Sequence, residues 1–341
     1  MTDATLLHVR DLDVTYRRSR RRGGDVHAVR GVDLTVARGE TVGLVGESGS
    51  GKSTIGSAVL GLVPVTGGSI AFDGADVTHG TRAERRLLAR RMQVVFQDPY
   101  GSMNPAHTVG DTLAEALRHN LGLPADEIRE RVLRALADVG LPPGAAHRHP
   151  AAFSGGQRQR IAIARALVME PDFVVCDEAV SALDLSVQAQ VLNLLARLKR
   201  TRGLSYLFIS HDLSVVRYLS DTIVVLYAGR VVERGPATLV ADSPAHPYAR
   251  ALLAAAPVPD PVAQRRRRAE RRTAAAATPA TDRVSEGCAF APRCPYAREI
   301  CWTARPDLVQ RDGVAVACHR RDEIAAGTAT LPDDRTTAGA A

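Results

Sequence analysis

Hydrophobic and polar positions along the chain follow two periods, one typical of strands and one typical of helices. Residues 5–16 alternate apolar and polar side chains, as a half-buried strand does. Continuous apolar runs at 41–45 and 173–176 are typical of strands in the middle of a parallel sheet. We expect further strands at 29–37, 70–77, 92–96, 204–209 and 222–227, and helices at 54–63, 186–202, 212–219 and, with breaks, through 108–170. Strands that alternate with helices predict an α/β core with a mostly parallel sheet.

The pattern changes in the last quarter of the chain. Residues 256–285 are rich in Pro, Ala and Arg and lack an apolar period, which is typical of a flexible linker. Residues 286–325 hold four of the 5 cysteines and predict a small Cys-rich C-terminal domain. We therefore expect a main domain at 1–255, a linker that isolates the small domain from it, and a disordered tail at 326–341.

Much of the formal net charge of +7 comes from two arginine clusters. One lies at 17–22, in a hairpin-like insertion, and the other lies at 264–272, inside the expected linker. Such clusters bind nucleic acid or anionic lipid in some proteins and form solvated loops in others. Neither cluster has the interleaved aromatic side chains of a base-stacking surface, so we expect no nucleic-acid partner.

The chain lacks a run of about 18 apolar residues, so we expect no membrane-spanning helix. Its first residues lack a basic-then-apolar signal pattern, which predicts that the chain stays in the compartment where it is made. A role at a membrane would then come through a partner. Cysteines in such a compartment argue against a disulfide framework.

The strongest chemical signal is the run Gly46–Ser53, a complete G-x-x-x-x-G-K-S phosphate-binding loop between a strand and a helix. Its glycines allow successive backbone N–H groups to curl around a phosphate, and the helix N-terminus adds partial positive charge. Lys52 supplies a full charge to the β- and γ-phosphates, and the Ser53 hydroxyl is a ligand for Mg²⁺. The predicted nucleotide-binding residues here are Gly46, Ser48, Gly49, Ser50, Gly51, Lys52, Ser53 and Thr54.

Two further motifs carry chemistry of the same kind. The strand at 173–176 ends in Asp177 and Glu178. Asp177 would hold Mg²⁺ through water, and Glu178 would orient or deprotonate a water that attacks the γ-phosphate, with a solvated turn as the alternative. Ser154 to Gln157 precede a helix, and they form either a second anion site or an ordinary N-terminal cap.

These motifs together resemble the nucleotide-binding subunits of ATP-binding cassette (ABC) transporters. The sequence carries the family's motifs in the family's order at 46–53, Gln97, 153–160, 177–178, 181–184 and 209–212. The resemblance covers about residues 5–255. It implies a P-loop NTPase with a RecA-like mixed sheet, an antiparallel β subdomain and a helical subdomain at about 98–168. Phe153 replaces the usual Leu of the signature, and Ala179 replaces a common Pro.

The resemblance also implies roles for single residues. Tyr16 resembles the aromatic residue that stacks on adenine, although a core strand position also explains a Tyr here. Gln97 resembles the residue that senses Mg²⁺ and the attacking water where the transmembrane partner docks. His211 resembles the switch residue that contacts the γ-phosphate, and Asp184 a residue at a dimer interface. The implied catalytic residues are Glu178, His211 and Gln97, and the implied Mg²⁺ ligands are Ser53, Gln97 and Asp177.

In this family two cassettes form a dimer around ATP. The resemblance implies that Ser154, Gly156 and Gln157 complete the nucleotide site of an opposing ABC ATPase, which is a different chain or a second copy. ATP then joins the two cassettes, and hydrolysis separates them. That motion is passed to membrane subunits.

A narrower resemblance, to the oligopeptide/dipeptide importer branch, rests on residues 97–105, 246–253 and 257–261. Within that branch the chain resembles the F-type ATPase of the D/F pair. The implied partners are two transmembrane permeases and an extracytoplasmic peptide-binding protein, with the chain peripheral at the cytoplasmic face of the cell membrane. Nickel importers share this branch, and a cassette ATPase acting on nucleic acid is the alternative outside it.

Four cysteines of the small domain have the spacing C-x5-C-x6-C-x16-C: Cys288, Cys294, Cys301 and Cys318. Four thiolates in a short unit are typical of a metal or cluster site in a reducing compartment. The spacing resembles the C-terminal extension of peptide-importer ATPases, which implies a [4Fe–4S] cluster. Zinc, or no metal at all, are the alternatives.

Overall fold

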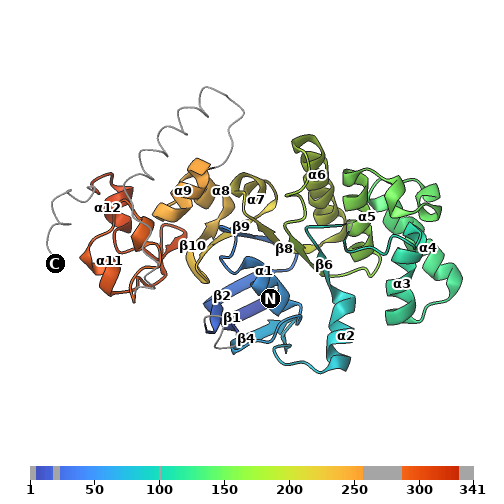
Figure 1. Cartoon of the computed structure of the whole chain (residues 1–341), viewed down its shortest axis with the longest axis horizontal. Coiled ribbons are helices and arrows are strands. Elements are labelled where there is room, and N and C mark those ends of the chain that lie inside the picture. The colour runs from blue at the N-terminus through green and yellow to red at the C-terminus, as the bar shows by residue number, and fades with distance from the viewer. Residues whose placement is uncertain (1–4, 18–23, 100, 256–285, 330–341) are drawn as a thin grey trace.

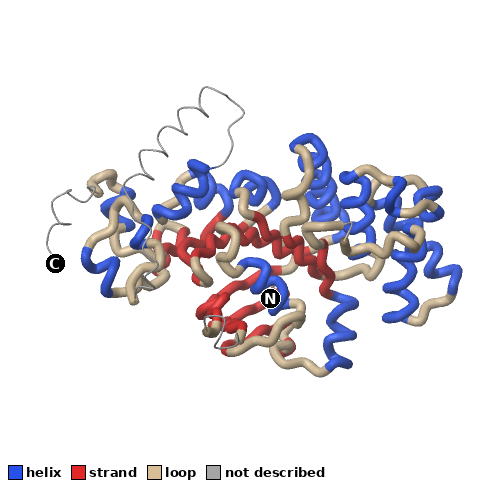
Figure 2. Tube along the Cα trace, viewed as in Figure 1, coloured by secondary structure: helices blue, strands red, loops and turns tan. Residues whose placement is uncertain are grey.

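The protein is described here by a computed structural model that places residues 5–17, 24–99, 101–255 and 286–329. Two sheets organise these residues (Figure 2). The antiparallel sheet has the order β2 (Val26–Ala37), β1 (Thr5–Tyr16), β4 (Gly67–Phe72) and β5 (Ala75–Asp76). The main sheet has the order β11 (Val309–Arg311), β12 (Val314–Val316), β10 (Arg230–Pro236), β9 (Thr222–Tyr227), β3 (Thr41–Val45), β8 (Ser205–Ser210), β7 (Phe173–Asp177) and β6 (Met92–Val95).

Five neighbouring strands of the main sheet, from β9 to β6, are parallel, which confirms the predicted α/β core. The helices are α1 (Lys52–Val59), α2 (Arg82–Arg91), α3 (Val109–Leu121), α4 (Ala125–Asp138), α5 (Gly155–Leu167), α6 (Leu185–Arg202), α7 (Leu213–Leu219), α8 (Ala237–Asp242), α9 (Pro247–Ala255), α11 (Glu299–Thr303) and α12 (Arg321–Ala325). Short 3-10 turns are η2 (Pro143–His147), η3 (Pro150–Ala152) and η4 (Ala291–Arg293). None of the described helices is long and apolar enough to cross a membrane.

The two faces of β3 show why the main sheet is layered. All five residues of the strand are buried. Val42 and Leu44 belong to one apolar core, shared with α1 and the antiparallel sheet. Gly43 faces the other way, where a Cβ would lie 2.0 Å from Val216 of α7. Figures 1 and 2 show α1 and the antiparallel sheet on one side of the main sheet, and α6 to α9 on the other.

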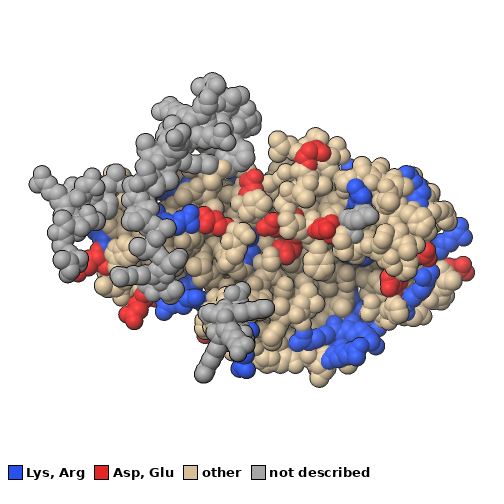
Figure 3. Space-filling model, viewed as in Figure 1, with Lys and Arg blue, Asp and Glu red and all other residues tan. Residues whose placement is uncertain are grey.

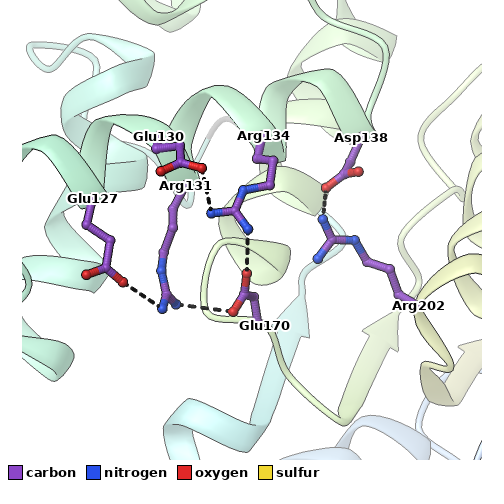
Figure 4. Close-up of polar contacts among 7 residues, drawn as sticks. All are labelled: Glu127, Glu130, Arg131, Arg134, Asp138, Glu170 and Arg202. Atoms are coloured by element: carbon purple, nitrogen blue, oxygen red, sulfur yellow. Dashed lines mark hydrogen bonds and ion pairs between the residues drawn. The ribbon is translucent and has the colours of Figure 1, made fainter.

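The helices α3, α4 and α5 form a separate region at one end of the molecule (Figure 1). Ion pairs join α4 to the turn before β7, because Glu170 pairs with Arg131 at 3.3 Å and with Arg134 at 3.6 Å (Figure 4). Asp138, at the end of α4, pairs with Arg202 of α6. These contacts are partly exposed, so each adds little stability, but together they fix the helical region against the main sheet.

The C-terminal residues are joined to the main sheet, which corrects the expectation of an isolated small domain. The strand β12 pairs with β10, with Val316 opposite Glu233 and Ala315 opposite Arg234. Phe290 and Val316 belong to the same apolar core as the helices on that face. The sequence did not predict this pairing, because β12 has only 3 residues and lies far from β10 in the chain. Spacing therefore gives no sign of their pairing.

The helix α2 was also missed. It buries no residue in this chain, so it lacks the apolar period by which helices are recognised. A capping box formed by Thr81 and Glu84 starts it, and this S/T-x-x-E pattern was the available signal. Its arginines are Arg82, Arg85, Arg86, Arg90 and Arg91. Basic side chains gather over α2 in Figure 3.

Several expectations fall on residues outside the described part of the chain. These are the linker at 256–285, the arginine cluster at 264–272, most of the cluster at 17–22, and the tail from 330 onward. Ala326–Ala329, which were expected to be disordered, form a hydrogen-bonded turn after α12, with the Thr328 N–H donating to the Glu323 carbonyl at 2.9 Å.

Candidate functional site

The phosphate-binding loop links β3 to α1, at the carboxyl end of the central strand. Two glycines are required by its shape. A Cβ on Gly46 would lie 2.2 Å from the Leu226 carbonyl oxygen. Gly51 has a φ of +105°, and a Cβ there would lie 2.3 Å from the Ala28 carbonyl oxygen.

The N-terminus of α1 is open to an anion. Its N-terminal cap, Gly51, offers no side-chain hydrogen bond to the first turn. The Ser50 hydroxyl is buried and has no hydrogen-bond partner among the residues that the structure describes. Backbone N–H groups without a cap, together with an unused hydroxyl, are features that fit a phosphate.

The Lys52 side chain is buried and folds back over this loop. Its Nζ donates to the carbonyl oxygens of Gly46 and Glu47, both at 2.8 Å. Burial lowers the pKa of the Lys52 ammonium, and the charges of Glu178 and Asp177 oppose that shift. The cation is therefore held by neutral carbonyl groups, which a phosphate can replace without breaking an ion pair.

The predicted metal ligands Ser53 and Asp177 are in contact. The Ser53 hydroxyl donates to Asp177 Oδ1 at 2.8 Å, across 124 positions of sequence. Burial raises the pKa of the Asp177 carboxyl, and the Ser53 hydrogen bond opposes that rise. A hydroxyl and a carboxylate side by side are hard oxygen ligands, the kind that Mg²⁺ prefers.

Glu178 lies beside His211. Its Oε2 is 3.4 Å from His211 Nδ1, so β7 and the turn after β8 bring the two residues together. The Glu178 N–H donates to the Ile209 carbonyl at 3.0 Å, and its φ is +49°. A non-glycine residue in this left-handed region is uncommon and is found often at functional sites.

Tyr16 and Gln97 lie at the margin of this group. Tyr16 is 39% exposed, and its hydroxyl is 3.4 Å from Thr54 Oγ1 in α1. A core position does not explain a Tyr that is exposed to this extent. Gln97 is exposed, two residues after the edge strand β6. The contacts in the described chain thus bring together Tyr16, Lys52, Ser53, Thr54, Asp177, Glu178 and His211.

The residues of the family's signature motif at 153–160, Ser154, Gly156 and Gln157, lie away from this group, at the start of α5. Ser154 and Gln157 form a reciprocal capping box, with the Ser154 N–H donating to Gln157 Oε1 at 3.0 Å. Gly156 is required because a Cβ would lie 2.3 Å from Val187 of α6. Figure 1 shows α1 near the middle of the molecule and α5 in the helical region. Phe153 is buried, with Arg148 stacked at 4.5 Å from its ring.

Asp184 caps α6 in this chain. Its Oδ1 accepts from the Val187 N–H at 2.9 Å and from the Ser186 hydroxyl at 2.8 Å. The carboxylate is exposed, so it can act as a helix cap here and still contact a partner.

Three residues near the phosphate loop were missed. The Glu47 N–H donates to the Tyr248 hydroxyl at 2.7 Å, and the Glu47 carboxylate is bound by Arg293. Tyr248 stands inside a motif that marks the importer branch, but the motif says nothing of its partner. Arg293 comes directly before Cys294, and spacing along the chain gives no sign of its contact with the loop.

The four late cysteines meet at one cavity of about 20 Å³ between the C-terminal turns and the start of α9. Its lining includes Cys288, Cys294, Cys301, Cys318, His246 and His319. None of the chain's cysteines, all of which are described, forms a disulfide bond. Burial raises the pKa of Cys294 to about 12 and that of Cys318 to about 11.

The cavity fits a metal centre in its chemistry but not in its size. The donor set is suitable, because four thiols converge on one space. However, a space of this size holds about one water molecule. Within the described ranges, no three His, Cys, Asp or Glu side chains are arranged to hold a metal ion. The expected [4Fe–4S] cluster is therefore unsupported by this geometry.

Two family models match the chain. Residues 29–181 match the family described as ABC transporter, and residues 232–301 match the oligopeptide/dipeptide transporter C-terminal region. A Brucella ovis protein named as a candidate peptide import ATP-binding protein is 48% identical over 322 residues, which cover 94% of this chain and 99% of that protein. A similarly named Brucella abortus protein is 49% identical over 314 residues, 91% of each chain.

Solved structures share the fold. The cbiO1 protein of Clostridium perfringens, described as part of the ABC transporter complex cbiONQ, is 30% identical with a TM-score of 0.62. The match covers 71% of this chain and 92% of that one. An ATP-binding cassette solved as a dimer in a post-hydrolysis state, bound to ADP and Pi, is 27% identical with a TM-score of 0.61, covering 68% of this chain and 99% of that one.

Proposed function

Because the chain belongs to the ABC transporter family, we propose that it is the ATP-hydrolysing subunit of a membrane importer for di- and oligopeptides. The main support for ATPase activity is that the open phosphate loop lies beside Ser53, Asp177, Glu178 and His211. The match of residues 232–301 to the oligopeptide/dipeptide transporter region supports the substrate class. The relatives named for peptide import agree with it, and none of these comparisons favours nickel.

We assign the roles as follows. Lys52 leaves its two carbonyl partners and binds the β- and γ-phosphates. Ser53, Gln97 and, through water, Asp177 would hold Mg²⁺. Bound Mg²⁺ would neutralise charge on the phosphates. Glu178 orients the attacking water and accepts its proton, and His211, whose Nδ1 lies 3.4 Å from that carboxylate, contacts the γ-phosphate as the switch residue. Tyr16 stacks on the adenine, and Gln97 links the site to the permease.

The second half of the site comes from a partner cassette. Ser154, Gly156 and Gln157 are exposed or half-buried at the start of α5, away from their own phosphate loop. They would cover the γ-phosphate bound by the partner, with Asp184 at the same interface. Ser154→Arg should leave ATP binding by this chain intact and stop hydrolysis at the partner's site. Unchanged hydrolysis in a complex whose other site is disabled would contradict this arrangement.

The assembly that we propose has this chain as the F-type ATPase of a D/F heterodimer, bound to two transmembrane permeases. It would lie at the cytoplasmic face of the membrane and receive substrate through an extracytoplasmic peptide-binding protein. Purification from the native membrane followed by mass spectrometry tests the assembly. Recovery with a second ABC ATPase and two permeases supports it, and recovery as a homodimer contradicts the D/F assignment.

We also propose that the four cysteines form a metal site, for which a [4Fe–4S] cluster would need the thiols to lie farther apart than they do in this structure. The support is the convergence of Cys288, Cys294, Cys301 and Cys318 without a disulfide bond. Anaerobically purified protein should then carry about four irons per chain and absorb visible light. If the purified protein instead contains one zinc per chain, the site binds zinc and not an iron–sulfur cluster. If the native protein contains no metal and all four thiols react with an alkylating agent, the proposed metal site is contradicted.

The importer is tested by ATPase activity of the reconstituted complex. A peptide-loaded binding protein should raise the rate of ATP hydrolysis, whereas a nickel-loaded one should not. If only the nickel-loaded binding protein raises the rate of ATP hydrolysis, the substrate is nickel and not peptide, while the assignment as an ATPase stands.

A further inference from the structure

The phosphate loop is held from outside the cassette by one side chain. Glu47 is the second residue of the loop, and its partner Arg293 lies 246 positions away. Arg293 Nη1 donates to Glu47 Oε2 at 2.7 Å, and Nη2 donates to Oε1 at 2.8 Å. Such two-point contacts fix both the position and the plane of a carboxylate.

Arg293 is itself held by aromatic rings. Its guanidinium lies 5.7 Å from the Phe290 ring and 6.0 Å from the Tyr227 ring. Phe290 is buried and packs against Tyr227 at 5.3 Å and Tyr248 at 5.4 Å. The cluster therefore reaches Glu47 twice, through the guanidinium to its carboxylate and through the Tyr248 hydroxyl to its backbone N–H.

We propose that Arg293 is a positioning residue for ATP binding, which holds Glu47 and neutralises its charge so that the phosphate loop accepts an anion. The proposal rests on the ATPase function assigned above and adds a C-terminal residue to that site.

Charge gives the first reason. A carboxylate in the phosphate loop opposes the binding of a polyanion, and a paired guanidinium removes most of that repulsion. The hydrogen bonds from Arg293 lower the pKa of the Glu47 carboxyl, so the carboxylate is ionised at neutral pH and needs this partner.

Position gives the second reason. The Glu47 carbonyl is one of the two groups that hold Lys52 Nζ before nucleotide binds. A movement of Glu47 would therefore displace the resting position of the cation that binds the phosphates.

The test is an equilibrium titration of the full chain with ATP in EDTA, where no turnover occurs. Arg293→Gln should weaken ATP binding by roughly three- to tenfold, because an unpaired carboxylate remains in the loop. Arg293→Lys, which keeps the charge, should recover most of the affinity. Arg298→Gln is the matched control, since Arg298 lies in the same C-terminal region and pairs with Glu323 at 3.2 Å. Its affinity should equal that of the wild type.

Glu47→Gln separates the proposed role from loss of packing. In this background Arg293→Gln should cost less than about 1.5-fold, because no charge is left to neutralise. The inference is overturned if Arg293→Gln binds ATP like the wild type, or if its full loss persists in the Glu47→Gln background. Failure of the wild type itself to bind ATP would instead overturn the ATPase function.

Discussion

The phosphate loop and the cysteine cavity both lie beside an apolar core, but they are built in different ways. The loop follows a fully buried central strand, and its partners Asp177 and His211 stand at the ends of neighbouring strands. The cavity is enclosed by short helices and turns, and its nearest regular support is the pairing of β12 with β10. The first site is set by the main sheet, whereas the second depends on contacts between segments far apart in sequence.

The largest effect should come from the catalytic carboxylate on the main sheet. Glu178→Gln keeps the size of the side chain and removes the proton acceptor, so ATP turnover at this site should fall by roughly 10²- to 10⁴-fold while ATP binding is kept. Glu170→Gln is the control at the opposite end of β7, because Glu170 also has a positive φ. Wild-type turnover by Glu178→Gln in a complex whose second site is disabled would refute the role.

This contrast explains what could be predicted from the sequence. Lys52, Ser53, Asp177 and Glu178 could be placed together because carboxyl ends of parallel strands meet at one sheet edge. The contact of Glu47 with Arg293 and the pairing of β10 with β12 could not, since both depend on how distant segments pack. The helix α2 could be recognised only by its capping box, because it buries no side chain.

The next effect tests the loop itself. Lys52→Ala removes the buried cation, so ATP affinity should fall by roughly 10- to 100-fold in an equilibrium titration. Lys199→Ala is the control, since Lys199 is a half-buried residue of α6 that pairs with Asp221, just before β9. Equal affinities for Lys52→Ala and the wild type would show that phosphate binds elsewhere.

A third prediction concerns how pH changes the stability of the fold where β10 contacts the C-terminal residues. Burial raises the pKa of Glu233 from 4.5 to about 7, so between these values the folded state keeps a proton that the unfolded state loses. Stability from this group therefore falls as pH rises. Burial lowers the pKa of His246 from 6.5 to about 4, so stability from this group rises with pH over that window.

In the wild type, the pH dependence of stability that comes from Glu233 opposes the one that comes from His246. Glu233→Gln should expose the histidine effect, with stability rising by roughly 2–3 kcal/mol between pH 4 and 6.5 in urea unfolding. Glu299→Gln, an exposed carboxylate of α11, should leave the wild-type profile unchanged. A flat profile for Glu233→Gln would show that His246 is not buried in its neutral form.

The smallest effect should come from the ion pairs that fix the helical region. Arg134→Ala removes the contacts with Glu130 and Glu170, both at 3.6 Å, from a side chain that is 51% exposed. The loss should stay below about 1 kcal/mol in urea unfolding and shrink further in high salt. A larger loss that salt does not reduce would place these charges in a site less hydrated than their exposure indicates.

The central claim is that ATP bound at this loop powers peptide entry. Its most direct test is uptake of a labelled peptide by vesicles that contain the complete complex, with ATP on the side of this subunit. The account predicts uptake that requires ATP, falls to background with Lys52→Ala, and persists with Lys199→Ala. Peptide uptake that continues without ATP, or at the wild-type rate with Lys52→Ala, would contradict it.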